Sequence, residues 1–104
     1  MTRGHVYRVR PPAGRGREQR GPRYGVIVQA DALFGLSTAI IAPTSRSAGP
    51  ATFRPAIRLG DDLTRVLVEQ LRAVDLDRLD EHVGRLAPDE QRAVDDALEL
   101  VLGL

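Results

Sequence analysis

Short runs of branched apolar residues, several of them soon followed by proline or by a polar turn, constrain the fold of this 104-residue chain most strongly. The run Val26-Ile27-Val28 is apolar on both faces, which is typical of a central strand. Pro43 is expected to end the following strand, and Pro55 places a later one at a sheet edge or a bulge. In total we expect five or six short strands among residues 4–9, 24–29, 38–42, 52–59, 64–71 and 81–86.

One helix is expected, over residues 88–102. Pro88 suits its first position, and Asp89 and Glu90 lie where acidic side chains complement the helix dipole. Apolar residues then recur at helical spacing up to Gly103, which is a common residue at a helix end. Polar turns are expected at residues 31–37 and 60–62, with a short helical turn after Asp75. The chain is therefore predicted to form a single domain, residues 1–104, of α+β class: a small antiparallel barrel or strongly bent sheet with a C-terminal helix.

Charge is distributed unevenly along the chain although the net charge is only +1. Residues 1–25 hold seven arginines and one acidic residue, whereas residues 61–104 hold five arginines and twelve acidic residues. Residues 10–22 form a long Gly/Arg-rich loop, and loops of this length are commonly functional or disordered. We expect a site for a polyanion here, with Arg15, Arg17 and Arg20 steering phosphates.

Several classes of protein are disfavoured by composition. The chain has no cysteine, which excludes disulfides and thiolate metal sites. Its first ten residues do not resemble a signal peptide, and no apolar run approaches the ~20 residues that span a bilayer. We therefore predict a cytoplasmic protein that binds no membrane. His5 and His82 are interpreted as ordinary strand residues, and the paired aspartates as solvated charge, so no metal and no cofactor are expected.

Five blocks of sequence, in this order, are similar to the MazF/PemK toxins: GHVYRV, EQRGPRYGVIVQ, STAIIAPTS, RVLVEQLRAVDLDRL and LELVLGL. The resemblance covers nearly the whole chain. It implies an SH3-like antiparallel β-barrel related to CcdB, assembled as a homodimer. It also implies a toxin of a type II toxin–antitoxin system, bound by a MazE-like antitoxin. The activity implied is that of an mRNA interferase: metal-independent endoribonuclease cleavage of single-stranded RNA to 2′,3′-cyclic phosphate and 5′-hydroxyl ends.

The resemblance also implies the catalytic residues. The family's EQ-x-G-x-R motif matches Glu18, Gln19, Gly21 and Arg23, which makes Arg23 the catalytic arginine. The catalytic hydroxyl follows the AP sequence and falls on either Thr44 or Ser45. The proline that usually follows the catalytic arginine is replaced by Tyr24-Gly25, which predicts a looser entry into the second strand. One branch of the family uses an Arg and an Asp for catalysis. This chain has Leu67 and Glu69 at the matching positions, so the chemistry of that branch is not expected here.

Chemical reasoning adds the remaining roles. RNA cleavage by its own 2′-hydroxyl needs a base, an acid and cations that stabilise phosphoryl charge. Arg23 suits the last role, and Glu18 or Glu69 is a candidate base because a guanidinium stays protonated. Glu18, Gln19, Glu69 and Gln70 are further candidates for RNA contacts, the last two from a predicted strand. Two other functions stay open: a non-enzymatic toxin that binds DNA gyrase, as CcdB does, and a basic RNA-binding module without catalysis.

Overall fold

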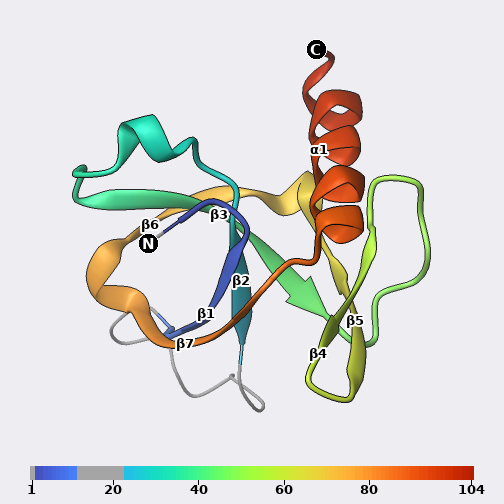
Figure 1. Ribbon diagram of the computed structural model, residues 1–104, viewed down its shortest axis with the longest axis horizontal. Helices are drawn as coiled ribbons and strands as arrows, with labels where there is room; N and C mark the ends of the chain where they lie inside the picture. Colours follow the sequence, from blue (N-terminus) through green and yellow to red (C-terminus); the bar gives the residue numbers. More distant parts are fainter. Residues whose placement is uncertain (1, 12–22) are drawn as a thin grey trace.

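Seven antiparallel strands and one α-helix make up the computed structural model, which describes residues 2–11 and 23–104 (Figure 1). The strands are β1 (His5–Val9), β2 (Tyr24–Ile27), β3 (Thr38–Ser45), β4 (Ala56–Leu59), β5 (Asp62–Val66), β6 (Arg72–Asp75) and β7 (Leu79–Arg85). Short 3-10 helices, η2 (Asp31–Leu33), η3 (Val68–Gln70) and η4 (Leu76–Arg78), connect some of them. The α-helix, α1 (Pro88–Leu102), closes the fold.

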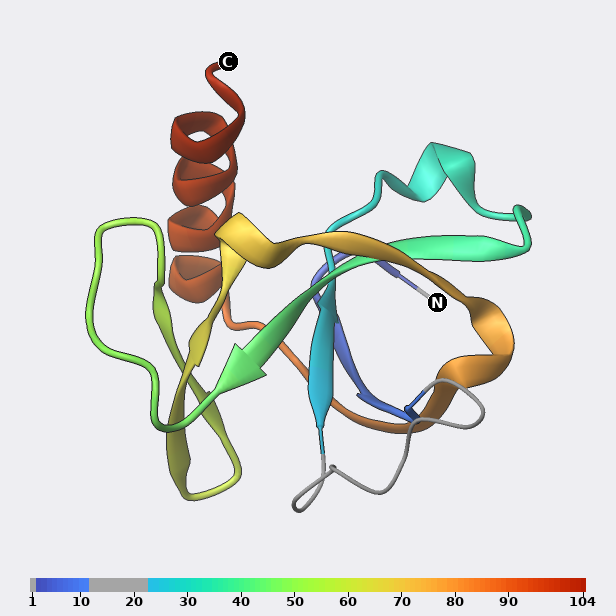
Figure 2. The same ribbon diagram turned by 180° about the vertical axis from the view of Figure 1, so that it is seen from behind.

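The sheet curls because its longest strand changes partners along its length. Neighbouring strands follow the order β4-β5-β3-β2-β1-β7, and β6 pairs with the first half of β3. The last two residues of β3, Thr44 and Ser45, pair with β5 instead. The result is a half-barrel of antiparallel strands, with α1 standing beside β4 and β5 (Figures 1 and 2). The predicted α+β class, the SH3-like barrel architecture and the C-terminal helix are confirmed.

The core lies on both faces of the central strands. Val26 of β2 packs in a cluster with Val94 and Ala97 of α1. Its neighbour Ile27 packs on the opposite face, in a second cluster that includes Ile41. Successive strand residues point to opposite faces, so β2 is buried on both, as its continuous apolar run predicts.

The helix α1 follows the predicted bounds. The Glu90 carboxylate accepts a hydrogen bond from the backbone amide of Ala87 at 2.8 Å, which satisfies one donor at the helix start. Gly103 ends the helix in the left-handed conformation, with φ of 71°, which glycine adopts without steric cost.

Two predictions about β3 and β4 were wrong in their bounds. Pro43 does not end the third strand, which continues to Ser45. The Pro43 carbonyl accepts a hydrogen bond from Leu67 at 2.8 Å, and the pairing with β5 begins at the next residue. The strand predicted over residues 52–59 begins only at Ala56, because residues 51–54 form a turn closed by a bond from Arg54 to Ala51. Its position at the sheet edge, expected from Pro55, is confirmed.

The strand predicted over residues 64–71 was also wrong. The structure ends β5 at Val66, places η3 after it, and starts β6 at Arg72. Val66, Leu67 and Val68 are all buried, so this apolar run fills the core while the backbone turns. The short helical turn expected after Asp75 is confirmed as η4. The last strand, predicted over residues 81–86, spans Leu79–Arg85.

Within the described parts of the chain, α1 is too short and too polar to cross a lipid bilayer, and no other helix approaches the required length.

Candidate active site

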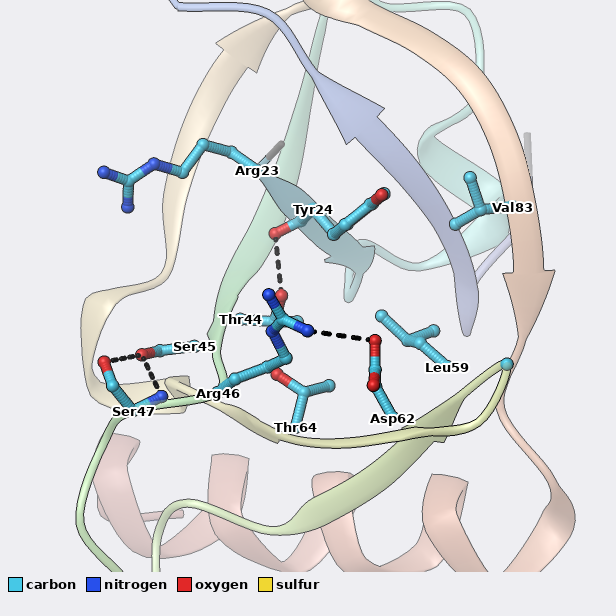
Figure 3. Close-up of a pocket in the computed structure, with 11 residues that line it drawn as sticks. Arg23, Tyr24, Thr44, Ser45, Arg46, Ser47, Leu59, Asp62, Thr64 and Val83 are labelled. Carbon is cyan, nitrogen blue, oxygen red and sulfur yellow. Dashed lines mark hydrogen bonds and ion pairs between the residues drawn. The ribbon is translucent and has the colours of Figure 1, made fainter. Parts of the chain in front are cut away.

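A pocket of about 580 Å³ lies where β2 begins, β3 ends and the β4–β5 turn approaches them (Figure 3). Polar side chains dominate its lining, as expected for a site that accepts a charged ligand. The lining residues are Arg23, Tyr24, Thr44, Ser45, Arg46, Ser47, Leu59, Gly60, Asp62, Thr64 and Val83. Arg23, Thr44 and Ser45, the three residues predicted to be catalytic, are therefore brought to one pocket.

Strand pairing places Thr44 beside the residue that follows Arg23. Gly25 pairs with Pro43, so the preceding residue of β2 lies next to the following residue of β3. The Thr44 hydroxyl donates a hydrogen bond to the Tyr24 carbonyl oxygen at 3.4 Å (Figure 3). The two pocket segments, far apart in sequence, are thus joined between Thr44 and the residue that follows Arg23.

Ser45 has a different set of contacts. Its Oγ lies 3.3 Å from the Ser47 Oγ and accepts a bond from the Ser47 amide at the same distance. These bonds fix the turn that leaves β3. They orient the Ser45 hydroxyl toward the turn, whereas the Thr44 hydroxyl is oriented toward β2.

Arg23 has an anchored backbone and an exposed side chain. Its carbonyl oxygen accepts a hydrogen bond from the Val9 amide at 2.9 Å, which fixes it to the end of β1. The side chain extends from the start of β2 away from Asp62 in Figure 3. A long cationic side chain on a fixed base suits a group that reaches for an anionic ligand.

The expected loosening at Tyr24-Gly25 is wrong. The strand β2 starts at Tyr24, directly after Arg23, and Tyr24 pairs with Arg8. Gly25 is buried, and a Cβ there would meet the Ile41 Cδ1 at 2.6 Å. The glycine therefore allows a close approach of β2 to the core instead of adding freedom.

Glu69 and Gln70 lie in η3, not on a strand as predicted, and neither lines the pocket. The Arg54 guanidinium contacts the Glu69 Oε2 at 2.6 Å and 2.9 Å. These hydrogen bonds hold the pKa of the Glu69 carboxyl below its ordinary value, against the opposing effect of burial. Among the described residues, the Glu69 Oε1 is buried and has no hydrogen-bond partner. A carboxylate held in this way is a poor proton acceptor at neutral pH.

The remaining predicted RNA contacts, at Arg15, Arg17, Glu18, Gln19 and Arg20, lie outside the described residues. Their roles stay predictions.

Arg46 and Asp62 line the pocket but were not predicted. The Arg46 Nη1 lies 3.1 Å from the Asp62 Oδ2, in an ion pair that joins the turn after β3 to the start of β5. Arg46 directly follows the two candidate hydroxyls, and that position was the available signal. The sequence did not indicate a role for Asp62, because a pair of aspartates in a turn is usually solvated charge.

The two histidines, interpreted from the sequence as ordinary strand residues, lie side by side on β1 and β7. The His5 Nδ1 and the His82 Nε2 are 2.9 Å apart, and the Tyr7 ring packs edge-on against His82. Burial, followed by the nearby His82 and Arg85, lowers the pKa of His5. Neither histidine lines the pocket. The described residues contain no group of three or more side chains arranged to hold a metal ion.

Comparison with known proteins identifies the family to which this chain belongs. A family model described as PemK-like, MazF-like toxin of type II toxin-antitoxin system matches residues 2–102. A Mycobacterium tuberculosis protein named as a candidate toxin is 39% identical over 106 residues, covering 100% of this chain and 99% of its own length. The chain therefore belongs to the PemK/MazF-like toxin family.

Solved structures share the fold. An endoribonuclease from a mycobacterial species, in complex with its cognate antitoxin, has a TM-score of 0.83 at 20% identity, covering 100% of this chain and 96% of that one. MazF from Deinococcus radiodurans has a TM-score of 0.80 at 23% identity, covering 100% and 97%.

Proposed function

We propose that this protein is an endoribonuclease that cleaves single-stranded RNA, with Arg23 and Thr44 at its active site. One observation carries the assignment: β2 and β3 pair so that Thr44 lies beside Tyr24, the residue that follows Arg23, and the Thr44 hydroxyl contacts the Tyr24 carbonyl. The names of the similar solved structures, an endoribonuclease and MazF, support the same activity.

The proposed reaction uses the RNA's own 2′-hydroxyl as the nucleophile. Its oxygen gives up its proton as it attacks the adjacent phosphorus, the bond to the 5′-oxygen breaks, and the 5′-oxygen takes up a proton. The products are a 2′,3′-cyclic phosphate and a 5′-hydroxyl. Arg23 supplies fixed positive charge and paired N–H donors to the phosphoryl oxygens as negative charge builds up there. The Thr44 hydroxyl donates a hydrogen bond to the same phosphoryl group. To do so it gives up its weak 3.4 Å hydrogen bond to the Tyr24 carbonyl.

No metal is assigned a role in this scheme, because Arg23 provides the charge that a metal would supply. Glu69 is left out as the base, since Arg54 holds its carboxylate outside the pocket. Glu18 stays a candidate from the sequence. Substrate positioning accounts for part of the rate in either case.

The test compares three variants on a mixed RNA pool. Arg23→Ala and Thr44→Val should each lower the cleavage rate by at least about 100-fold, the usual loss for one charge-stabilising donor. Ser45→Ala is the matched control and should keep most of the activity, because its hydroxyl is oriented toward Ser47. All variants should melt like the wild type, and EDTA should not stop the reaction.

Three results would contradict this assignment. Fragments without cyclic phosphate ends would exclude the proposed reaction, and full activity in Arg23→Ala would exclude its role. A wild-type protein that never cleaves RNA would favour binding without catalysis, to RNA or to a protein target such as gyrase.

We further propose that the active form is a homodimer and that a MazE-like antitoxin inhibits it. Family membership supports both, as does the solved complex of a similar endoribonuclease with its antitoxin. Sedimentation of the purified chain, and co-purification with the product of an adjacent reading frame, test the two assemblies separately.

A further inference from the structure

An ion pair lies among the side chains that line the candidate pocket. The Arg46 Nη1 and the Asp62 Oδ2 are 3.1 Å apart, and their side chains are 69% and 60% exposed. Among the described residues that line this pocket, Asp62 is the single carboxylate. In Figure 3 the Arg46 side chain reaches across the pocket toward Asp62, whereas Arg23 extends in another direction. The pocket thus holds two arginines on different segments, and Asp62 pairs with Arg46.

We propose that Arg46 forms a second phosphate-binding position, which takes a backbone phosphate of the RNA next to the scissile one. In this scheme Asp62 pairs with the Arg46 guanidinium when no RNA is bound and competes with the phosphate for it. The inference rests on the proposed RNA-cleaving function, because it assigns a neighbouring subsite to the same pocket.

The exchange of partners costs little. An ion pair between exposed side chains contributes only about 0–1 kcal/mol, so an incoming anion can break it easily. Asp62 engages one terminal nitrogen of Arg46, and this is the single polar contact of the Arg46 side chain within the described residues. A phosphate can accept two parallel N–H bonds from the same guanidinium, which is the stronger arrangement.

Location favours a phosphate on the same strand of RNA. Arg46 immediately follows Thr44 and Ser45, whose hydroxyls line the same pocket, and the Ser45–Ser47 bonds hold the start of the turn that carries it. A single strand that places one phosphate between Arg23 and Thr44 therefore passes Arg46 as it continues across the pocket. The carboxylate of Asp62 lowers affinity there, and this limits the binding of arbitrary polyanions.

Opposite effects of two substitutions provide the test. The probe is a pool of random-sequence 2′-O-methyl oligonucleotides, which lack the free 2′-hydroxyl and stay intact. Arg46→Ala should weaken binding about tenfold, the value of one charge-assisted contact. It should also reduce the magnitude of the slope of log K against log salt by about 0.7, which corresponds to one lost phosphate on a single strand. Asp62→Asn should tighten binding about twofold to fivefold.

Arg92→Ala is the matched control, since Arg92 is an exposed arginine of α1 that does not line the pocket. It should leave the affinity and the slope close to those of the wild type. Arg46→Lys should retain the slope with lower affinity, because the charge stays and the fork of donors is lost. Thermal melting of each variant confirms that the fold is intact.

Defined outcomes would overturn this inference. Arg46→Ala with the affinity and slope of Arg92→Ala would do so, as would weaker binding by Asp62→Asn or no binding by the wild type at low salt. A parallel titration with inorganic phosphate separates the two ligand sources. If inorganic phosphate binds in an Arg46-dependent way and the oligonucleotide does not bind, the inference is also contradicted. If the wild type cleaves RNA and Arg46→Ala binds normally, this inference fails alone. If the binding effects appear but no RNA is cleaved, the proposed function fails alone.

Discussion

Replacement of Gly25 by alanine should destabilise the fold at the base of the candidate site. A Cβ at this position would lie 2.6 Å from the Ile41 Cδ1 and 3.2 Å from the Val9 Cγ2. Ile41 is fully buried and Val9 is 6% exposed, so neither side chain can move into solvent. The added methyl must therefore force the buried Ile41 side chain out of its position or shift β2, next to the pairing of Gly25 with Pro43.

The expected loss follows from the cost of overpacking a core. An extra methyl group in a close-packed interior typically costs about 1–3 kcal/mol. A domain of this size loses about 4–8 °C in Tm per kcal/mol, so Gly25→Ala should melt about 4–24 °C below the wild type. Gly84→Ala is the matched control, because Gly84 also lies in a strand and no atom lies within 4 Å of the added Cβ. Thermal unfolding followed by circular dichroism measures both.

A second substitution shows whether the clash itself is responsible. Ile41→Val deletes the Cδ1 methyl that the new Cβ would meet, and alone it should cost about 0.5–1.5 kcal/mol. In the Gly25→Ala background it should instead restore stability, with a coupling energy of about 0.5–3 kcal/mol. Strictly additive losses in the double variant, or a Gly25→Ala protein that melts like Gly84→Ala, would refute the packing explanation.

Three further outcomes are expected. Folding lowers the pKa of His5 from 6.5, so at lower pH the unfolded chain binds more protons than the folded one. The contribution of neutral His5 to stability is therefore complete above about pH 6.5 and is lost as the pH falls below that value. His5→Asn should flatten that part of a pH–Tm curve, and an unchanged curve would contradict the assignment. Arg54→Met should destabilise the protein by about 1–3 kcal/mol in denaturant titration by leaving Glu69 unpaired, and more than Glu69→Gln does; equal losses would argue against it. Val94→Ala should cost about 1–3 kcal/mol by opening a cavity between α1 and the sheet, whereas Asp96→Ala, on the exposed face, should melt like the wild type.

Local patterns account for the parts of the fold that were predicted correctly. Helical spacing and the flanking Pro88 and Gly103 located α1 to the residue, because caps and an apolar face are encoded within a few turns. The run Val26-Ile27-Val28 identified a strand buried on both faces in the same way. The errors fell at the end of β3, where the strand changes partners, and at the start of β4 and the end of β5, where the backbone turns. Pro43 breaks a strand only if its missing amide is needed, and that depends on which strand lies beside it.

The sequence by itself determined the class of fold, the C-terminal α-helix and the arginine and hydroxyl residues that the pocket brings together. Tertiary structure alone decided which of the other charged groups meet. It joined Arg46 to Asp62 in the pocket, Arg54 to Glu69 outside it, and His5 to His82 across 77 positions of sequence. The physical reason is that side-chain spacing fixes which face of an element is apolar. Burial of those faces against one another then brings together polar residues whose separation in sequence carries no trace of the contact.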